Sequence, residues 1–318
     1  MLLNIGLTVL GFVILIKCAD FFVEGSASLA RNFKISTTVI GLTIVAFGTS
    51  APELAISFNS HLSNNPDMLF GNVIGSSIGN ILVILGIAIL IKPLKIEPEV
   101  VRKQIPILLL VTLGLSVLLL DTFFNSTDYN SLSRADGVIL LLFFSIFIYY
   151  LITIIKADKV NQANIEEPKY KLPRSTLMIL LGLVGIIFGS NLIVDNVEAF
   201  ALNIGISQKI ISVTVISIGT SLPELVTTII AAKKGENNMA IGNIIGSNIF
   251  NICVVLGLPV VILGEAVTTA FTIVDIIFMT TAVVLLWAFS VTAREIKRIE
   301  AIVFLAVYAA YVGYIFIQ

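Results

Sequence analysis

Two glutamates, Glu53 and Glu224, lie inside strongly apolar stretches of this 318-residue chain. Each follows Gly-Thr-Ser and a proline, in GTSAPEL (48–54) and GTSLPEL (219–225), and neither has a Lys or Arg nearby in its own stretch. A charge in an apolar medium costs several kcal/mol unless it is paired. Two buried carboxylates without basic partners therefore predict a bound cation, and their repetition argues against a purely structural role.

The other candidate ligands are hydroxyl and amide side chains that also occur in two copies: Thr49, Ser50, Ser76 and Asn80, then Thr220, Ser221, Ser247 and Asn251. In each copy the later Ser and Asn are four residues apart, so they share one helix face. Such oxygen donors, without His or Cys, suit Ca²⁺, Na⁺ or Mg²⁺ and disfavour zinc, copper and iron. Two negative charges balance one Ca²⁺ or two Na⁺, so one pocket could bind Ca²⁺ and Na⁺ in alternation. Interhelical hydrogen bonding is the alternative role for the asparagines.

The residues just before each glutamate predict interrupted helices. Pro52 lacks a backbone donor and frees the carbonyl of Gly48, and Pro223 does the same for Gly219. Within a membrane, backbone N–H and C=O groups without helical hydrogen bonds are tolerated only where protein or a water-lined cavity forms hydrogen bonds with them. The freed carbonyls are further oxygen ligands for a cation.

The composition indicates which class of protein carries these residues. Apolar residues make up 57% of the chain and charged ones 12%, the mean hydropathy is +1.04, and the net charge is −1. A soluble surface needs about 25% charged residues, so the chain is a polytopic membrane protein, and its charge balance excludes a nucleic-acid binder. Cys18 and Cys253 lie in apolar stretches and form neither a disulfide framework nor a metal spacing.

Ten stretches are candidates to cross a bilayer, which takes roughly 20 apolar residues. They are centred on 3–30, 37–61, 69–91, 104–121, 136–156, 175–202, 208–232, 239–263, 270–291 and 297–317. We therefore expect an all-α fold of ten transmembrane helices. With the N-terminus outside, sixteen Lys and Arg fall in or beside inner loops, and only Arg134 and Lys209 fall in outer loops. This asymmetry predicts a plasma-membrane protein with both termini extracellular.

An internal repeat organises these helices. At an offset of 171 residues, 48–54 aligns with 219–225, and 71–86 aligns with 242–257 at 11 of 16 identical positions. The halves are 1–156, with its repeat block at about 37–91, and 175–318, with its block at about 208–263; a charged cytoplasmic linker, 157–174, joins them. Five helices per half give the halves inverted orientations, a hallmark of secondary transporters with a midplane ion site. We expect helices 2, 3, 7 and 8 to be broken there.

The two blocks, GTSAPEL with GNVIGSSIGN and GTSLPEL with GNIIGSNIFN, resemble the alpha-repeats of the calcium/cation antiporter superfamily, especially compact prokaryotic sodium/calcium exchangers. The resemblance covers the whole chain. It implies exchange of Na⁺ for Ca²⁺ by alternating access, with helices 1 and 6 sliding past an eight-helix core. The stoichiometry usual in the family, three Na⁺ per Ca²⁺, would make transport electrogenic.

The resemblance also implies a ligand set. It places side-chain ligands on the ten hydroxyl, amide and carboxylate residues named above, and backbone carbonyl ligands on Ala46 and Ser217. Asn251 stands where potassium-dependent relatives carry Asp, which argues against K⁺ co-transport. The short linker has no room for a calcium-sensing domain. No cofactor and no obligatory protein partner is expected.

Three other functions compete with Na⁺/Ca²⁺ exchange. A Ca²⁺/H⁺ antiporter on the same scaffold is the nearest, because two close carboxylates repel each other and protons would compete for the site. A cation channel commonly places its pore between subunits, whereas this chain carries a complete inverted pair. An intramembrane enzyme lacks support, because no nucleophile–base pair and no Walker A, EF-hand, HExxH or GxSxG motif occurs.

Overall fold

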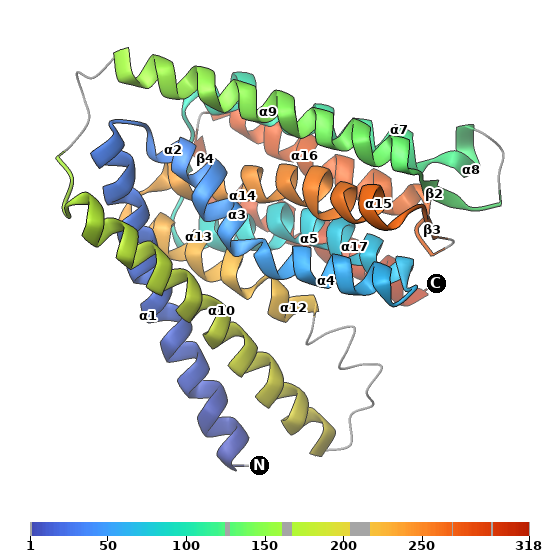
Figure 1. Cartoon of the computed structure of the whole chain (residues 1–318), viewed down its shortest axis with the longest axis horizontal. Coiled ribbons are helices and arrows are strands. Elements are labelled where there is room, and N and C mark those ends of the chain that lie inside the picture. The colour runs from blue at the N-terminus through green and yellow to red at the C-terminus, as the bar shows by residue number, and fades with distance from the viewer. Residues whose placement is uncertain are drawn as a thin grey trace.

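The computed structural model describes residues 2–124, 128–160, 167–203, 217–268, 270–293 and 295–317. Most of them are helical, and most of the long helices run along the longest axis of the molecule (Figure 1). The first-half elements are α1 (Leu2–Phe33), α2 (Thr37–Ile40), α3 (Ala46–Thr49), α4 (Ala51–Leu62), α5 (Pro66–Gly79), α6 (Gly86–Ile91), β1 (Leu94–Lys95), α7 (Ile105–Leu119), α8 (Asp121–Phe124), β2 (Asn130–Leu132) and α9 (Arg134–Val160).

The second-half elements are α10 (Leu172–Asn203), α12 (Ser217–Thr220), α13 (Leu222–Lys234), α14 (Asn237–Phe250), α15 (Gly257–Leu263), β3 (Ala266–Thr268), α16 (Ile273–Ala293), β4 (Glu295–Ile296) and α17 (Arg298–Ile317). Among the described residues, the π-helical segments Gly41–Val45, Asn80–Leu85 and Asn251–Leu256 join α-helices end to end, and a further one, Val100–Gln104, leads into α7. The helices α9 and α10 both extend into the expected 157–174 linker.

Eight helices among the described residues are long and apolar enough to cross a membrane, and the consecutive helices α2 to α4 form a ninth span with a 44° bend. The seventh expected span, 208–232, lies partly outside the described residues and is seen from Ser217 onward as α12 and α13. The predicted succession of apolar helices is therefore recovered, and the interruption at helix 2 is a true bend.

Two short antiparallel strand pairs connect the halves. Leu94 of β1 lies opposite Ile296 of β4, and Leu132 of β2 lies opposite Ala266 of β3. At the repeat offset, 94–95 corresponds to 265–266 at the start of β3. Figure 1 shows β4 toward one end of the bundle and β2 with β3 at the other. Repeat mates β1 and β3 thus lie at opposite ends, as inverted halves require.

The helices α1 and α10 form a unit of their own. They lie side by side and cross the direction of the other helices obliquely (Figure 1). Glycines bring their backbones into contact: a Cβ added at Gly189 would lie 2.8 Å from the Leu15 nitrogen, and one at Gly182 would lie 2.9 Å from the Cys18 oxygen. Small residues permit this approach, which is typical of membrane helix pairs.

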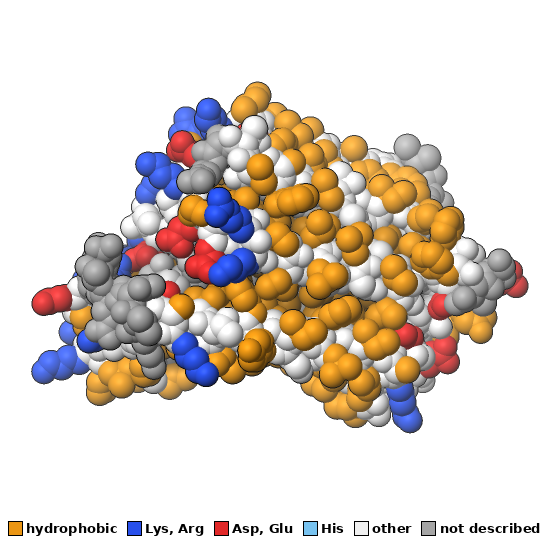
Figure 2. Space-filling view, turned by 90° about the horizontal axis from the view of Figure 1, so that it is seen from above, with side chains coloured by type: hydrophobic (Ala, Val, Ile, Leu, Met, Phe, Trp, Pro, Cys, Tyr) orange, Lys and Arg blue, Asp and Glu red, His pale blue; other side chains and the backbone are white. Residues whose placement is uncertain are grey.

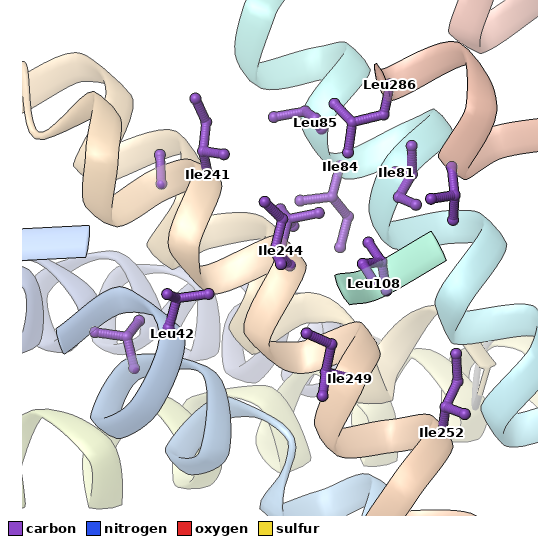
Figure 3. Close-up of a cluster of buried hydrophobic side chains, with 14 of the residues drawn as sticks. Leu42, Ile81, Ile84, Leu85, Leu108, Ile241, Ile244, Ile249, Ile252 and Leu286 are labelled. Atoms are coloured by element: carbon purple, nitrogen blue, oxygen red, sulfur yellow. The ribbon is translucent and has the colours of Figure 1, made fainter. Parts of the chain in front are cut away.

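The remaining helices pack around α14, whose residues from Met239 to Ile249 are all buried. Figure 3 shows the centre of this core, where side chains of α14 face those of the helix formed by α5 and α6, with Leu108 of α7 and Leu286 of α16 beside them. The face seen in Figure 2 is largely apolar, and most of the Lys and Arg visible on it gather toward one end. The core therefore fixes α14 at the centre, where it carries Ser247.

Candidate functional site

The helix breaks occur at Ser50 and Ser221. Both are turn residues between two helices, Ser50 with φ −86° and ψ 8° and Ser221 with φ −87° and ψ −1°. Pro52 and Pro223 follow in the first turn of α4 and α13, where a missing N–H costs little. Each break starts a new helix whose first turn carries the glutamate. The N-terminal end of a helix favours negative charge, so this placement suits a carboxylate.

The two glutamates meet at the contact between the halves. Glu53 and Glu224 are each 1% exposed. The Ser50 hydroxyl of the first half donates to Oε1 of Glu224 at 2.9 Å. Among the described residues, Oε2 of each glutamate is buried and accepts no hydrogen bond. Ser50, at the helix break of the first half, therefore contacts Glu224 of the second half. One carboxylate oxygen of each glutamate has no hydrogen-bond donor among the described residues.

Asn80 and Asn251 supply two more such oxygens. Each is 1% exposed and begins a π-helical segment, so the expected interruptions of helices 3 and 8 take the form of π-helical turns within continuous helices. The Oδ1 atoms of both asparagines are buried without a donor in the described part of the chain. Four buried acceptors without donors would cost free energy, and a cation would offset that cost.

Two of the predicted hydroxyl ligands, Thr49 and Ser247, contact the carbonyl of Ala46. That oxygen accepts from Thr49 Oγ1 at 3.2 Å, from Ser247 Oγ at 3.4 Å and from the Ser50 nitrogen at 3.0 Å. The hydroxyl of Ser76 donates within its own helix, to the Asn72 carbonyl at 2.5 Å. Each of the three hydroxyl donors, on Thr49, Ser247 and Ser76, keeps oxygen lone pairs available for an ion.

Two predicted ligands of the second half differ in burial from their mates in the first. Thr220 and Ser221 are partly exposed, whereas Thr49 and Ser50 are fully buried. Ser217 begins α12, but its side chain lies outside the described residues. The carbonyl of Gly219, which Pro223 frees, accepts from Ser190 of α10 at 2.8 Å. At the offset of 171, the mate of Ser190 is Ala19, which has no hydroxyl. The chemical symmetry of the sequence is therefore only partly kept in the structure.

Sequence reasoning missed a second layer of amides. Asn72 Nδ2 donates to the Glu53 carbonyl at 2.9 Å and to Ser57 Oγ at 3.0 Å. Its repeat mate Asn243 donates to Thr228 Oγ1, the mate of Ser57, at 2.9 Å. Asn243 Oδ1 also lies 3.4 Å from Thr49 Oγ1. Both asparagines lie in the strongest repeat block, 71–86 and 242–257, and their repetition there is the signal that could have identified them.

Glycines bring α14 against the first-half break. A Cβ at Gly246 would lie 2.7 Å from the Leu42 oxygen, and one at Gly242 would lie 2.8 Å from the Thr38 oxygen. These distances leave no room for a side chain at either residue. The approach carries Ser247 to the Ala46 carbonyl.

Within the described ranges, no three His, Cys, Asp or Glu side chains cluster. The donor set therefore consists of two carboxylates with amide, hydroxyl and carbonyl oxygens. Ca²⁺ and Na⁺ accept such hard ligands, and Ca²⁺ takes about 6–8 of them in flexible geometry. The arrangement can bind a hard cation at the interface of two inverted halves.

Comparisons with known proteins agree with this geometry. The profile of the family described as sodium/calcium exchanger protein matches residues 3–153 and 174–317. The chain belongs to the sodium/calcium exchanger family. It is 36% identical over 310 residues to the putative antiporter CaxA of Alkalimonas amylolytica, covering 96% of this chain and 95% of that protein. It is 30% identical over 354 residues to the sodium/calcium exchanger MaX1 of Methanosarcina acetivorans, covering 98% of both.

A solved structure gives the same result for the fold. The sodium-calcium exchanger NCX_Mj, soaked with 10 mM Na⁺ and zero Ca²⁺, matches with a TM-score of 0.83 and 33% identity over 98% of both chains. This exchanger-family protein thus has the expected ten-helix architecture of two inverted repeats. It is a multi-pass membrane transporter of the cation/Ca²⁺ antiport type and not an enzyme.

Proposed function

We propose that this exchanger-family protein couples the movement of Na⁺ to that of Ca²⁺ by alternating access, with net charge moved in each cycle. The observation that carries the proposal is the set of four buried oxygens without donors, on Glu53, Glu224, Asn80 and Asn251. Two carboxylates balance one Ca²⁺ or two Na⁺. Sodium/calcium exchange is also the activity in the names of MaX1 and NCX_Mj.

The ligand set that we propose joins both halves at one site. It comprises Ala46, Thr49, Ser50, Glu53, Ser76 and Asn80 from the first repeat, and Ser217, Thr220, Ser221, Glu224, Ser247 and Asn251 from the second. Direct contacts between the halves, such as Ser50 with Glu224 at 2.9 Å, support one shared site in place of two separate ones.

We further propose that α1 and α10 move together against the other helices. Their close glycine-mediated contact supports this shared movement. The chain would then consist of the halves 1–156 and 175–318 about a cytoplasmic linker, in the plasma membrane with both termini outside. The gathering of Lys and Arg at the linker end supports this orientation (Figure 2).

A Ca²⁺/H⁺ antiporter remains the second candidate, because the site holds two buried carboxylates, those of Glu53 and Glu224. A proton taken up by one of them would remove their mutual repulsion. Protons would then replace Na⁺ as the driving ion, with the same residues at the site.

Flux measurements on proteoliposomes distinguish the two. Vesicles loaded with Na⁺ are diluted into Na⁺-free buffer with radioactive Ca²⁺, and parallel vesicles carry a pH gradient or no gradient. We expect Na⁺-driven Ca²⁺ uptake that responds to membrane potential. Uptake driven by the pH gradient alone would establish Ca²⁺/H⁺ antiport, and uptake that ignores potential would contradict net charge movement.

A further inference from the structure

A buried asparagine outside the proposed ligand set contacts one of its members. Asn248 of α14 is 0% exposed. Its Oδ1 accepts from Nδ2 of Asn80 at 3.0 Å, and its own Nδ2 donates to the Ser77 carbonyl at 3.4 Å. The amide of Asn248 is therefore held by the backbone of the opposite half, with its oxygen turned toward Asn80.

This contact decides which end of the Asn80 amide faces the site. A carboxamide presents an oxygen acceptor at one end and an NH₂ donor at the other, and the two ends have nearly the same shape. The NH₂ end of Asn80 is bound by Asn248. Its Oδ1, which has no donor among the described residues, then points the other way. With the opposite rotamer, an NH₂ group would face the cation and repel it.

The second half lacks the matching contact. At the offset of 171, the mate of Asn248 is Ser77, and the mate of Asn80 is Asn251. The Ser77 hydroxyl is buried and makes no hydrogen bond in the part of the chain that the structure describes, so it does not hold Asn251. One asparagine is thus held in its ligand orientation by the opposite half, and its mate is not held in this way.

We propose that Asn248 is a positioning residue that orients the Asn80 amide so that its oxygen can bind the ion. This proposal rests on the proposed function of the site. It acts through Asn80 and touches no ion itself. Partners that orient a metal ligand typically change metal affinity by about 10–100-fold when they are removed. The expected consequence is a change in ion affinity and not in the number of transport cycles at saturation.

The test uses Asn248→Leu, which keeps the approximate shape of the side chain and removes both hydrogen bonds. In proteoliposomes we expect the half-saturating Ca²⁺ concentration to rise about tenfold, with the maximal rate within about twofold of wild type. Equilibrium Ca²⁺ binding to the purified protein should weaken by the same factor. The matched control is Ser77→Ala, which removes the unbonded hydroxyl at the mate position and should leave half-saturation unchanged.

A second background separates positioning from general damage. In Asn80→Ala, the further change Asn248→Leu should have no added effect on half-saturation, because the group that Asn248 orients is gone. An equal added effect in that background, or a wild-type half-saturation in Asn248→Leu alone, overturns the proposal. If Asn248→Leu does not fold, Asn248→Ser replaces it, since serine occupies the mate position and is too short to reach Asn80. Wild-type vesicles with no Ca²⁺ uptake under any gradient would instead refute the proposed function.

Discussion

At the scale of single residues, the site is defined by oxygens that the protein itself leaves without donors. Glu53 and Glu224 each have one carboxylate oxygen in this condition, and Asn80 and Asn251 each have the amide oxygen. The carboxylates are the most costly of the four groups to bury, because an uncompensated charge has the largest desolvation penalty. They should therefore contribute most of the binding free energy of a cation.

Replacing either glutamate tests that expectation. In Glu53→Gln or Glu224→Gln, one charge is lost while the shape of the side chain is kept. Removing one partner of a buried charge pair costs about 2–5 kcal/mol, so Ca²⁺ affinity should fall more than about 30-fold and transport should stop at micromolar Ca²⁺. The measurement is Ca²⁺ uptake alongside the unfolding temperature, with exposed Glu265→Gln as the control. Normal exchange by a folded Gln variant would remove that glutamate from the site.

At the scale of elements, each of these four groups lies at or next to an interruption of a helix. The breaks at Ser50 and Ser221 put each glutamate in the first turn of a new helix. The π-helical segments begin at Asn80 and Asn251, which are repeat mates. Insertion of a wider turn rotates the following residues, and such segments are frequent at functional sites. Glycines then set how closely the interrupted helices approach.

Gly246, where α14 crosses the first-half break, gives a prediction for these elements. A Cβ in Gly246→Ala would meet the Leu42 oxygen at 2.7 Å and the Ala46 Cβ at 2.8 Å, so α14 must move away from α3. Overpacking of this kind costs about 1–3 kcal/mol of the free energy of unfolding, and it should weaken Ca²⁺ binding by moving Ser247. Thermal unfolding and Ca²⁺ titration measure the two effects.

The control for this change is Gly86→Ala, whose Cβ would lie at ordinary contact distance, 3.4 Å from side-chain atoms of Leu305 and 3.6 Å from the Ala301 oxygen. Both substitutions raise helix propensity by about 1 kcal/mol, so only the steric effect differs between them. Equal stability and equal Ca²⁺ binding in the two variants would show that the α14 crossing does not position the site.

At the scale of the whole molecule, ion pairs tie the α1–α10 unit to the other helices at the end rich in Lys and Arg. Lys234 of α13 lies 2.8 Å from Asp20 and 2.8 Å from Glu24 of α1. Lys169, just before α10, lies 3.1 Å from the same Glu24, whose carboxylate raises the pKa of Lys169 through their hydrogen bond. Three segments thus meet at Glu24. The cluster should stabilise the arrangement in which this end of the unit contacts α13.

Lys234→Gln should therefore lower the population of that arrangement. The variant removes both contacts between α13 and the acids of α1, so distances between spin labels on α1 and α13 should become longer or more broadly distributed. Lys103→Gln is the matched control, because its partner Glu99 lies on the same helix and ties no second element. An unchanged distance distribution in Lys234→Gln would show that these ion pairs do not hold the unit in place.

The sequence by itself determined the membrane class, the inverted repeat and the two glutamates at interrupted helices. Those features are local: an apolar stretch, a proline without a donor and an unpaired acid can each be recognised without knowing their neighbours. The tertiary structure alone decided that Ser50 contacts Glu224, that Asn248 holds Asn80, that Ser190 binds the Gly219 carbonyl and that Lys234 pairs with Glu24. The physical reason is that lipid and protein interior are equally apolar. An apolar helix therefore carries little sequence signal for the face it turns toward its neighbours, and its rotation and crossing are settled only by packing.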